Sequence, residues 1–295
     1  MQLNHLRSFY EVARHGSFTR ASQALRVSQP SLSKMVKILE IEENVRLLDR
    51  NRRGGIALTP VGRSLFQRLQ PIFEEIGNLR SVIEKEKDEC AGELKIGCSD
   101  NVGNYILPEV FHDFLVEYPN ARPLLFGGTS ESIQAEMVKS NVELGLFYAV
   151  SREDVFHYER LGFVEFVVVH APNGKSRLHL KDLAKNIYVS SRSTDYGKPF
   201  PALRMLQSLG IVPRNVFESS QQETQKRLVL KGIGYGVFPK FMVKNELETG
   251  ALKLVSIPKK IGSEIYLVRR KNRTLSRTAD VFAATLKNKI RTFLA

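Results

Sequence analysis

The chain has 295 residues, enough for two or three domains, and its 42% hydrophobic and 25% charged residues are ordinary for a globular protein. No apolar run approaches the roughly 20 residues of a membrane span, and the first 24 residues are charged and amphipathic, which argues against a secretory signal and for the cytoplasm. Two cysteines, Cys90 and Cys98, are too few for a disulfide scaffold, and the histidines show no metal-ligand spacing, so we expect neither metal nor cofactor.

The net charge of +13 is unevenly distributed. Residues 1–62 hold ten basic and five acidic side chains, whereas residues 63–89 hold five and six, which leaves +9 for the long remainder. A dense basic N-terminus suits a polyanion such as DNA. The alternative is that these side chains only keep the chain in solution, and charge alone does not decide between the two interpretations.

Two helices are predicted in the first 25 residues. Apolar residues at helical spacing indicate the first, namely Leu3, Leu6, Phe9, Tyr10 and Ala13. Gly16 ends this helix, as glycine commonly does just past a C-terminus. Thr19 is placed to cap a short second helix that runs through Leu25.

A third helix follows a tight turn at residues 26–28. Ser28 can cap it, and Pro30 is tolerated in its first turn because no hydrogen bond is lost there. One face is apolar and consists of Leu32, Met35, Val36 and Leu39. The other face is polar and basic and consists of Gln29, Ser33, Lys34 and Lys37.

Two short helices joined by a tight turn, the second with a basic outer face, are typical of a DNA-binding helix-turn-helix. Gln29 has the amide geometry to bind adenine, Lys34 can contact guanine, and short serine hydroxyls suit phosphates. After this helix, the basic, glycine-rich residues 50–55 between short apolar runs predict a β-wing. The predicted DNA contacts are Thr19, Ser28, Gln29, Pro30, Ser31, Ser33, Lys34, Lys37, Arg52 and Arg53. The alternative is a small helical bundle with a charged solvent face.

Several segments of this region resemble the signature of LysR-type regulators. They are residues 17–21 (Ser-Phe-Thr-Arg-Ala), residues 27–33 (Val-Ser-Gln-Pro-Ser-Leu-Ser), Leu39-Glu40, and residues 58–62 (Leu-Thr-Pro-Val-Gly). The resemblance is specific over residues 1–66 and weaker beyond. It implies a winged helix-turn-helix at residues 1–59 whose recognition helix begins at the Gln-Pro-Ser segment. Two positions differ from the family pattern: Asn44 replaces a usual glycine, which Asn tolerates in the left-handed conformation, and Leu48 replaces a usual phenylalanine.

Residues 60–89 predict one long linker helix. Its apolar residues are spaced by four and three in alternation, as in a heptad seam: Leu65, Leu69, Ile72, Ile76, Leu79 and Ile83. We expect a homodimer through this helix, and the resemblance implies the same, with dimers often pairing into homotetramers. The alternative is that the stripe packs on the chain's own domain. Pro71 removes one backbone hydrogen bond inside the helix.

Residues 90–295 alternate short strands with helices, which predicts a mainly parallel sheet covered on both faces. We expect two α/β lobes joined by crossover strands, with lobe I at residues 90–163 and 267–295 and lobe II at residues 164–266. The overall fold class is therefore α/β with a helix-rich winged helix-turn-helix at the N-terminus. The resemblance implies an effector-binding domain similar to periplasmic binding proteins.

Polar loops follow several strands of this region, and ligands of such sheets bind beyond the carboxyl ends of strands. Helix N-termini there offer free N–H groups to an anion. The predicted effector-binding residues are Ser99, Asp100, Thr129, Ser130, Tyr148 and Gln222. The alternative for each serine or threonine is that it only caps its helix.

The sequence therefore predicts a DNA-binding transcriptional regulator controlled by a small-molecule effector. The net charge of +9 on residues 90–295 favours an anionic effector, and surface lysines explain that charge equally well. The main alternative is a non-specific DNA-binding protein without an effector. We expect no enzyme, because no nucleophile–base–acid set is found. The sequence leaves open a redox role for Cys90 or Cys98.

Overall fold

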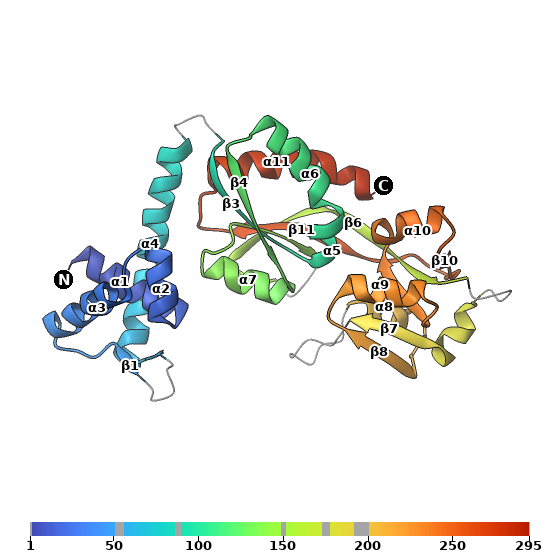
Figure 1. Ribbon diagram of the computed structural model, residues 1–295, viewed down its shortest axis with the longest axis horizontal. Coiled ribbons are helices and arrows are strands. Elements are labelled where there is room, and N and C mark those ends of the chain that lie inside the picture. Colours follow the sequence, from blue (N-terminus) through green and yellow to red (C-terminus); the bar gives the residue numbers. More distant parts are fainter. Residues whose placement is uncertain are drawn as a thin grey trace. The chain divides into compact units, whose positions relative to one another are not determined.

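The structure is a computed structural model that describes residues 2–50, 56–85, 90–148, 152–172, 178–191 and 201–294. It divides into an N-terminal unit, Met1–Asp88 with Arg273–Ser276, and a C-terminal unit, Glu89–Asn272 with Arg277–Ala295 (Figure 1). Each unit is described by itself.

The N-terminal unit is a winged helix-turn-helix followed by a long helix. Its elements are α1 (Leu3–His15), α2 (Phe18–Leu25), α3 (Gln29–Glu42), β1 (Leu48–Arg50), β2 (Ile56–Leu58) and α4 (Pro60–Lys85). β1 and β2 pair antiparallel, with Leu48 opposite Leu58. Side chains from α1, α2 and α3 and the start of α4 form one core, with Phe9, Val12, Leu32 and Leu39 fully buried.

Local backbone chemistry sets the helix ends as the sequence predicts. Gly16 ends α1 in the left-handed conformation (φ 60°), which glycine adopts without steric cost. Asn44 also has a positive φ, 50°, shortly after α3. The replacement of glycine by Asn at this position is thus accommodated.

The C-terminal unit contains the remaining elements. Its helices are α5 (Asp100–Tyr105), α6 (Leu107–Glu117), α7 (Ser130–Val138), α8 (Pro201–Ser208), α9 (Gln222–Leu230), α10 (Lys244–Glu248) and α11 (Arg277–Leu294), with short η1 (Leu180–Lys185) and η2 (Lys240–Val243). Its strands are β3 (Gly92–Cys98), β4 (Ala121–Gly127), β5 (Leu144–Tyr148), β6 (Phe156–His170), β7 (Ile187–Ser191), β8 (Asn215–Ser219), β9 (Tyr235–Pro239), β10 (Lys253–Leu254) and β11 (Ile261–Arg270).

The strands of this unit form one sheet in the order β4-β3-β5-β11-β6-β9-β7-β8, and β10 pairs with β6. β3 pairs parallel with β4 and β5, and β7 pairs parallel with β8 and β9. Between these two parallel groups, β6 and β11 run antiparallel to each other and to their neighbours. They are the crossover strands that the sequence predicts between two α/β lobes.

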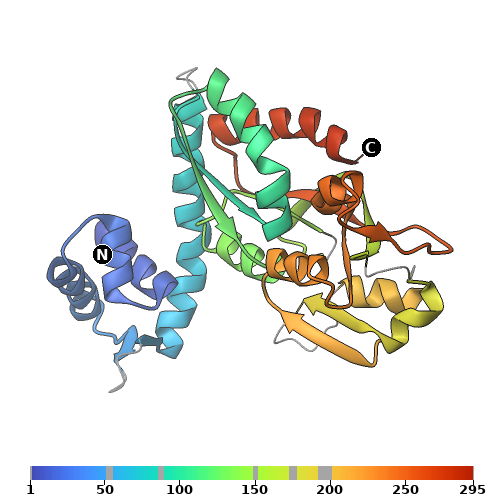
Figure 2. The ribbon, with the colours of Figure 1, turned by 45° about the vertical axis from the view of Figure 1, so that its right-hand side comes forward.

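Each lobe has its own core. Lobe I carries β3–β5, and its helices α6 and α11 lie side by side, where the Phe114 and Phe282 rings meet edge to face at 5.2 Å (Figure 1, Figure 2). Lobe II carries β7–β9, and Val189, Val229 and Phe238 lie at its centre. The mixed α/β fold class predicted from the sequence is confirmed.

The structure differs from the predicted element pattern in two places that matter for the site. Asp100 and Asn101, which the sequence pattern places in a loop, belong to α5, and the first crossover strand, β6, begins at Phe156, whereas the sequence pattern predicts a strand only from Phe166 to His170. β6 is longer than a strand within one lobe because it continues through both lobes. α5 brings Asn101 and Tyr105 to the edge of lobe I, and neither is among the predicted effector-binding residues.

Candidate functional site

The turn between α2 and α3 is built by two serine caps and one left-handed residue. Ser17 caps α2 and accepts the Arg20 N–H at 3.4 Å, and Ser28 caps α3 and accepts the Ser31 N–H at 3.3 Å. Between them, Arg26 has φ 55°, so the chain reverses within three residues. The prediction that Ser28 caps the third helix is confirmed.

The predicted capping role of Thr19 is wrong. α2 begins at Phe18, so Thr19 lies inside its first turn and Ser17 takes the capping position. A side-chain oxygen caps only from the residue that precedes the helix. Thr19 is nevertheless exposed, and its carbonyl accepts the Ser22 hydroxyl at 2.9 Å.

The outer face of α3 is polar and open to solvent. Gln29 is exposed in the first turn of the helix, and Lys34 and Lys37 are exposed in its middle, on the face opposite the buried Leu32, Val36 and Leu39. Other predicted contacts lie on the same stretch: Ser28 and Pro30 are exposed, and Ser31 and Ser33 are half-buried. This arrangement of a polar helix start and basic side chains matches the geometry of a recognition helix. Arg52 and Arg53 lie outside the described residues.

A carboxylate that the sequence analysis does not single out as functional connects α3 to the wing. Glu40 accepts the backbone N–H of Leu47 at 2.7 Å and of Leu48 at 3.1 Å. At the other end of the wing, the Thr59 hydroxyl donates to the Arg46 carbonyl at 2.7 Å and accepts the Gly62 N–H at 3.0 Å. The wing is therefore held at both ends by side-chain hydrogen bonds.

Gly62 cannot be another residue without a backbone shift. A Cβ placed there would lie 2.1 Å from the Leu47 carbonyl oxygen. The segment at residues 58–62 thus has a structural reason for its Thr and Gly. The hydroxyl joins wing and α4, and the glycine lets the two backbones approach.

In lobe I, three strands end at one edge and bring predicted effector residues together. Cys98 of β3 lies opposite Gly127 of β4 and Leu146 of β5. Backbone hydrogen bonds join the loops that follow, from Ser99 N–H to the Leu146 carbonyl at 3.3 Å and from Gly128 N–H to the Cys98 carbonyl at 3.1 Å. Ser99, Thr129 and Tyr148 therefore lie at the carboxyl edge of lobe I.

The hydroxyls at this edge have different roles. Thr129 caps α7 and accepts the Ser132 N–H at 3.2 Å, and the Ser130 hydroxyl donates to Glu131 at 3.2 Å, which favours the capping alternative for Thr129. Ser99 makes no cap and donates instead to the Asn101 side-chain oxygen at 2.9 Å. Asp100 is exposed at the start of α5.

Asn101 is a buried polar residue that the prediction missed. It is 1% exposed, and within the described part of the chain its side-chain nitrogen has no hydrogen-bond partner. The hydroxyl of Tyr148 is likewise buried and has no partner within ordinary hydrogen-bond distance among those residues; burial raises its pKa far above the ordinary value, and a longer interaction with the Asn101 side chain only partly offsets this. Buried polar atoms without partners are costly and mark places where a ligand or water binds.

Lobe II contributes a matching polar edge. Gln222 is the first residue of α9, and its buried side-chain oxygen has no partner among the described residues. Gln225, also missed by the prediction, is 3% exposed and donates to the Ser191 hydroxyl at 3.1 Å and the Ser219 carbonyl at 2.7 Å. The carboxyl ends of β7 and β8 are thus joined by one amide.

The two cysteines are buried thiols. Burial, helped by the nearby Asp100 charge, raises the pKa of Cys98 to about 12, and the Gly103 N–H only partly offsets this. A thiol with so high a pKa stays protonated and is a poor nucleophile. The burial and the raised pKa of Cys98 therefore argue against a redox role for this thiol.

Neither a metal-ligand cluster nor a membrane-spanning helix is present in the described ranges. No group of three His, Cys, Asp or Glu side chains there is arranged to hold a metal ion. No helix in the same ranges is long and apolar enough to cross a membrane.

Comparisons with known proteins agree with this architecture. Residues 3–63 match the family model "Bacterial regulatory helix-turn-helix protein, lysR family", and residues 87–291 match "LysR substrate binding domain". The uncharacterized HTH-type transcriptional regulator YcgK of Bacillus subtilis is 28% identical over 298 residues, which cover 92% of this chain and 90% of that protein.

Among solved structures, a full-length OxyR variant from Pseudomonas aeruginosa has a TM-score of 0.74 and 21% identity, with 99% of this chain and 95% of that chain covered. Full-length LysG from Corynebacterium glutamicum with bound effector Arg has a TM-score of 0.64 and 18% identity, with 99% of both chains covered. At these identities the structural likeness shows the fold alone.

Proposed function

Because this chain belongs to the LysR family of transcriptional regulators, we propose that it is a sequence-specific DNA-binding regulator whose activity is controlled by a small-molecule effector bound between its two α/β lobes. The observation that carries the proposal is the pairing, in one chain, of an exposed basic recognition helix with an edge of buried, unsatisfied polar groups. The first binds DNA, and the second binds the effector. The DNA-binding, linker and effector-binding roles are assigned to residues 1–59, 60–89 and 90–295.

At the DNA, Gln29 binds a base edge from the first turn of α3, and Lys34 reaches a base from the next turn. Gln29 is exposed in the first turn of α3, and Lys34 is exposed on the face opposite the buried stripe, which supports these roles. Lys37 and the short hydroxyls of Ser28, Ser31 and Ser33 contact phosphates and fix the register of the helix in the major groove. Thr19, Pro30, Arg52 and Arg53 complete the proposed interface.

The protein acts as a homodimer through α4. Leu65 and Leu69 at the start of the predicted seam pack in the winged-helix core, with Leu69 3% exposed. Further along, Ile72 and Leu79 are 49% and 58% exposed, so this half of the seam has apolar surface for a second α4. The Ile83 side chain lies outside the described residues.

Dimers pair into tetramers through the C-terminal units. Both edge strands of the sheet expose apolar side chains, for example Leu124 of β4, 50% exposed, and Phe217 of β8, 44% exposed. Exposed apolar edge strands favour pairing with another chain.

The cytoplasmic location expected for such a regulator stays a prediction.

The effector occupies the polar edges of the two lobes. Asn101, Tyr148 and Gln222 are proposed as its main contacts, because each has a buried polar atom without a partner in the described residues. Ser99, Asp100, Thr129 and Ser130 lie beside them, with Thr129 acting also as a helix cap. LysG, with its bound effector Arg, supports a small molecule as the ligand.

The proposal is tested by comparing the affinity of the full chain for the DNA upstream of its own gene with its affinity for an unrelated duplex at the same salt concentration. We expect specific binding to be tighter by a factor of about 10³ or more. Equal affinity for both duplexes would instead support a non-specific DNA-binding protein.

The effector half of the proposal is tested by a thermal-shift screen of small metabolites against the full chain. A compound that binds the folded protein raises its melting temperature, and Asn101→Ala or Gln222→Ala should abolish that shift without weakening binding to unrelated DNA. If compounds stabilise both variants as well as the native chain, the effector site lies elsewhere.

A further inference from the structure

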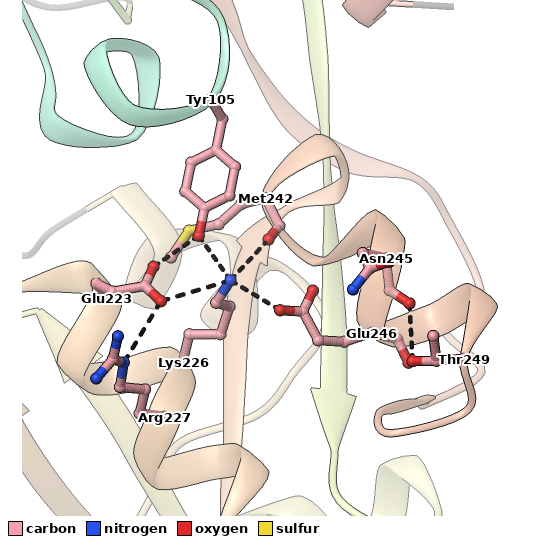
Figure 3. Close-up of polar contacts among 8 residues, drawn as sticks. All are labelled: Tyr105, Glu223, Lys226, Arg227, Met242, Asn245, Glu246 and Thr249. Atoms are coloured by element: carbon pink, nitrogen blue, oxygen red, sulfur yellow. Dashed lines mark hydrogen bonds and ion pairs between the residues drawn. The ribbon is translucent and has the colours of Figure 1, made fainter. Parts of the chain in front are cut away.

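One side chain of lobe I lies within the packing of lobe II. Tyr105 is the last residue of α5, and its hydroxyl donates to Glu223 at 2.6 Å and accepts a hydrogen bond from Lys226 at 2.6 Å (Figure 3). Both partners belong to α9 of lobe II. The Tyr105 ring packs against the lobe II core and lies 6.3 Å from the Phe241 ring.

The ammonium of Lys226 is at the centre of this contact. Its side chain is only 8% exposed, and it binds Glu246 at 2.8 Å, the Met242 carbonyl at 3.4 Å and Glu223 at 3.6 Å in addition to Tyr105 (Figure 3). It also lies 4.9 Å from the centre of the Tyr105 ring, in cation–π range. Of these partners, Tyr105 alone comes from lobe I.

Electrostatics keep this lysine charged. Burial by itself lowers the pKa of Lys226, but the hydrogen bonds with Glu246 and Tyr105 outweigh it, so that its pKa is raised. A buried ammonium needs a partner for each N–H, because leaving a donor unsatisfied is costly. Separation of the lobes would remove the Tyr105 oxygen and leave one N–H of the buried Lys226 ammonium without its closest acceptor. The cost of losing that hydrogen bond favours the arrangement in which the two lobes are in contact.

The contact lies one helical turn from the proposed effector residues in both lobes. Asn101 and Tyr105 are four residues apart on α5, and Gln222 and Lys226 are four residues apart on α9. Residues four apart lie on the same side of a helix. A ligand that binds Asn101 and Gln222 therefore acts on the two short helices whose next turns hold the lobes together.

We propose that Tyr105, Glu223 and Lys226 form an inter-lobe latch that holds lobe I against lobe II, and that an effector bound at Asn101 and Gln222 regulates the protein by changing the stability of this latch. The second half rests on the proposed function, whereas the first half concerns the effector-free chain. An effector shifts the lobe arrangement only if it binds latched and unlatched states with different affinity. Tyr105 does not bind the effector in this proposal but fixes the position of lobe I relative to lobe II, and it is therefore a positioning residue.

The latch is tested by measuring the distance between the lobes in the full chain. Spin labels are attached to Val116→Cys on α6 and Val212→Cys before β8, which replace side chains that are 74% and 67% exposed. The native Cys90 and Cys98 are buried, and a sample without the new cysteines checks that they take no label. Dilution with unlabelled chain restricts the double electron–electron resonance signal to pairs within one chain.

Tyr105→Phe removes the latch hydroxyl and leaves the ring. We expect the ratio of separated to latched lobes to rise about tenfold, seen as a broader distribution with a longer mean distance. Tyr118→Phe is the matched control, because its hydroxyl bonds to the neighbouring Glu117 at 2.6 Å within lobe I. Its distribution should equal that of the native chain.

Glu223→Gln is a second variant, for use if Tyr105→Phe does not fold. It weakens the same contact at a position whose side chain is 39% exposed. The latch is overturned if Tyr105→Phe, or Glu223→Gln in its place, gives the native distribution, or if Tyr118→Phe changes it equally. Neither DNA nor effector is present, so this failure would leave the DNA-binding and effector tests unaffected. Conversely, a chain that binds no specific DNA could still have the latch.

Discussion

The Glu40 carboxylate accepts the Leu47 backbone N–H at 2.7 Å and thereby joins the recognition helix to the first strand of the wing. Leu47 and Leu48 are 1% and 8% exposed, so water cannot replace this acceptor. The two elements proposed to contact DNA, α3 and the wing, are therefore joined by the hydrogen bonds of one side chain as well as by their shared core. The proposed function depends on this rigidity, since base contacts need a defined position relative to phosphate contacts.

Replacement of Glu40 tests this role. Glu40→Ala leaves two buried N–H groups without an acceptor, and we expect the free energy of unfolding to fall by about 2 kcal/mol, with weaker DNA binding. Glu40→Gln keeps an oxygen acceptor and should lose roughly half as much. Urea unfolding of both variants measures the difference. An alanine variant as stable as the native chain would show that the carboxylate does not hold the wing.

Substitutions on α3 separate base contacts from phosphate contacts. Gln29→Ala should weaken specific binding by about 1–3 kcal/mol and relax the preference at one base pair. Lys37→Ala should weaken binding to all sequences equally and lower the slope of log affinity against log salt by about 1. Titrations at several salt concentrations on specific and unrelated duplexes distinguish the two. The assignments fail if the two variants behave alike.

A charge on the exposed part of α4 should dissociate the proposed dimer. Leu79→Glu puts a carboxylate at a position that is 58% exposed in one chain, so the chain itself should still fold. A buried, unpaired charge at the helix pair is unfavourable, and we expect a monomer by sedimentation at concentrations where the native chain is dimeric. Gln67→Glu adds the same charge to an exposed α4 position outside the seam and should leave the dimer intact. A dimeric Leu79→Glu chain would place the interface elsewhere.

Cys98 should be inert in the folded protein. With a pKa of about 12, about one thiol in ten thousand is ionised at pH 8, so maleimide should label Cys98 only after unfolding. The pH dependence has a defined sign. Below pH 9 the thiol is mostly protonated in both states, whereas between its ordinary pKa of 9.0 and about 12 only the unfolded state loses its proton, so stability falls as pH rises.

Cys98→Ala should remove this contribution to the loss of stability at alkaline pH. Thermal unfolding of the native and variant chains between pH 8 and 10 makes the comparison. Rapid labelling of Cys98 in the folded chain, or an identical pH slope in both proteins, would show that the thiol is more accessible than its burial indicates.

Much of the N-terminal unit could be predicted from sequence because its signals are local. Gly16, Ser28 and the apolar stripe on α3 each act within a few residues, and the structure has them as expected. The capping error at Thr19 has the same origin. Ser17 and Thr19 are both good caps, and the local sequence does not say which one precedes the first helical residue.

The missed features depend on contacts between distant residues. α5 is only six residues long, which is too short for a repeating pattern of apolar residues to reveal a helix, so the sequence does not single out Asn101 or Tyr105. Glu40 bonds to backbone groups, which carry no sequence signature. Tyr105 and Lys226 are 121 positions apart and meet only because the crossover strands bring the lobes together. These contacts of the C-terminal unit can therefore be identified only once the folded structure is known.

The most direct test of the central claim is a footprint of the purified chain on the DNA upstream of its own gene, near physiological salt and with excess competitor DNA. We predict protection of two half-sites on one face of the duplex, about 10 base pairs or a multiple apart, as paired recognition helices require, and loss of this pattern in Gln29→Ala. Uniform protection, or the same pattern in Gln29→Ala, would contradict a specific dimeric regulator that recognises DNA through α3.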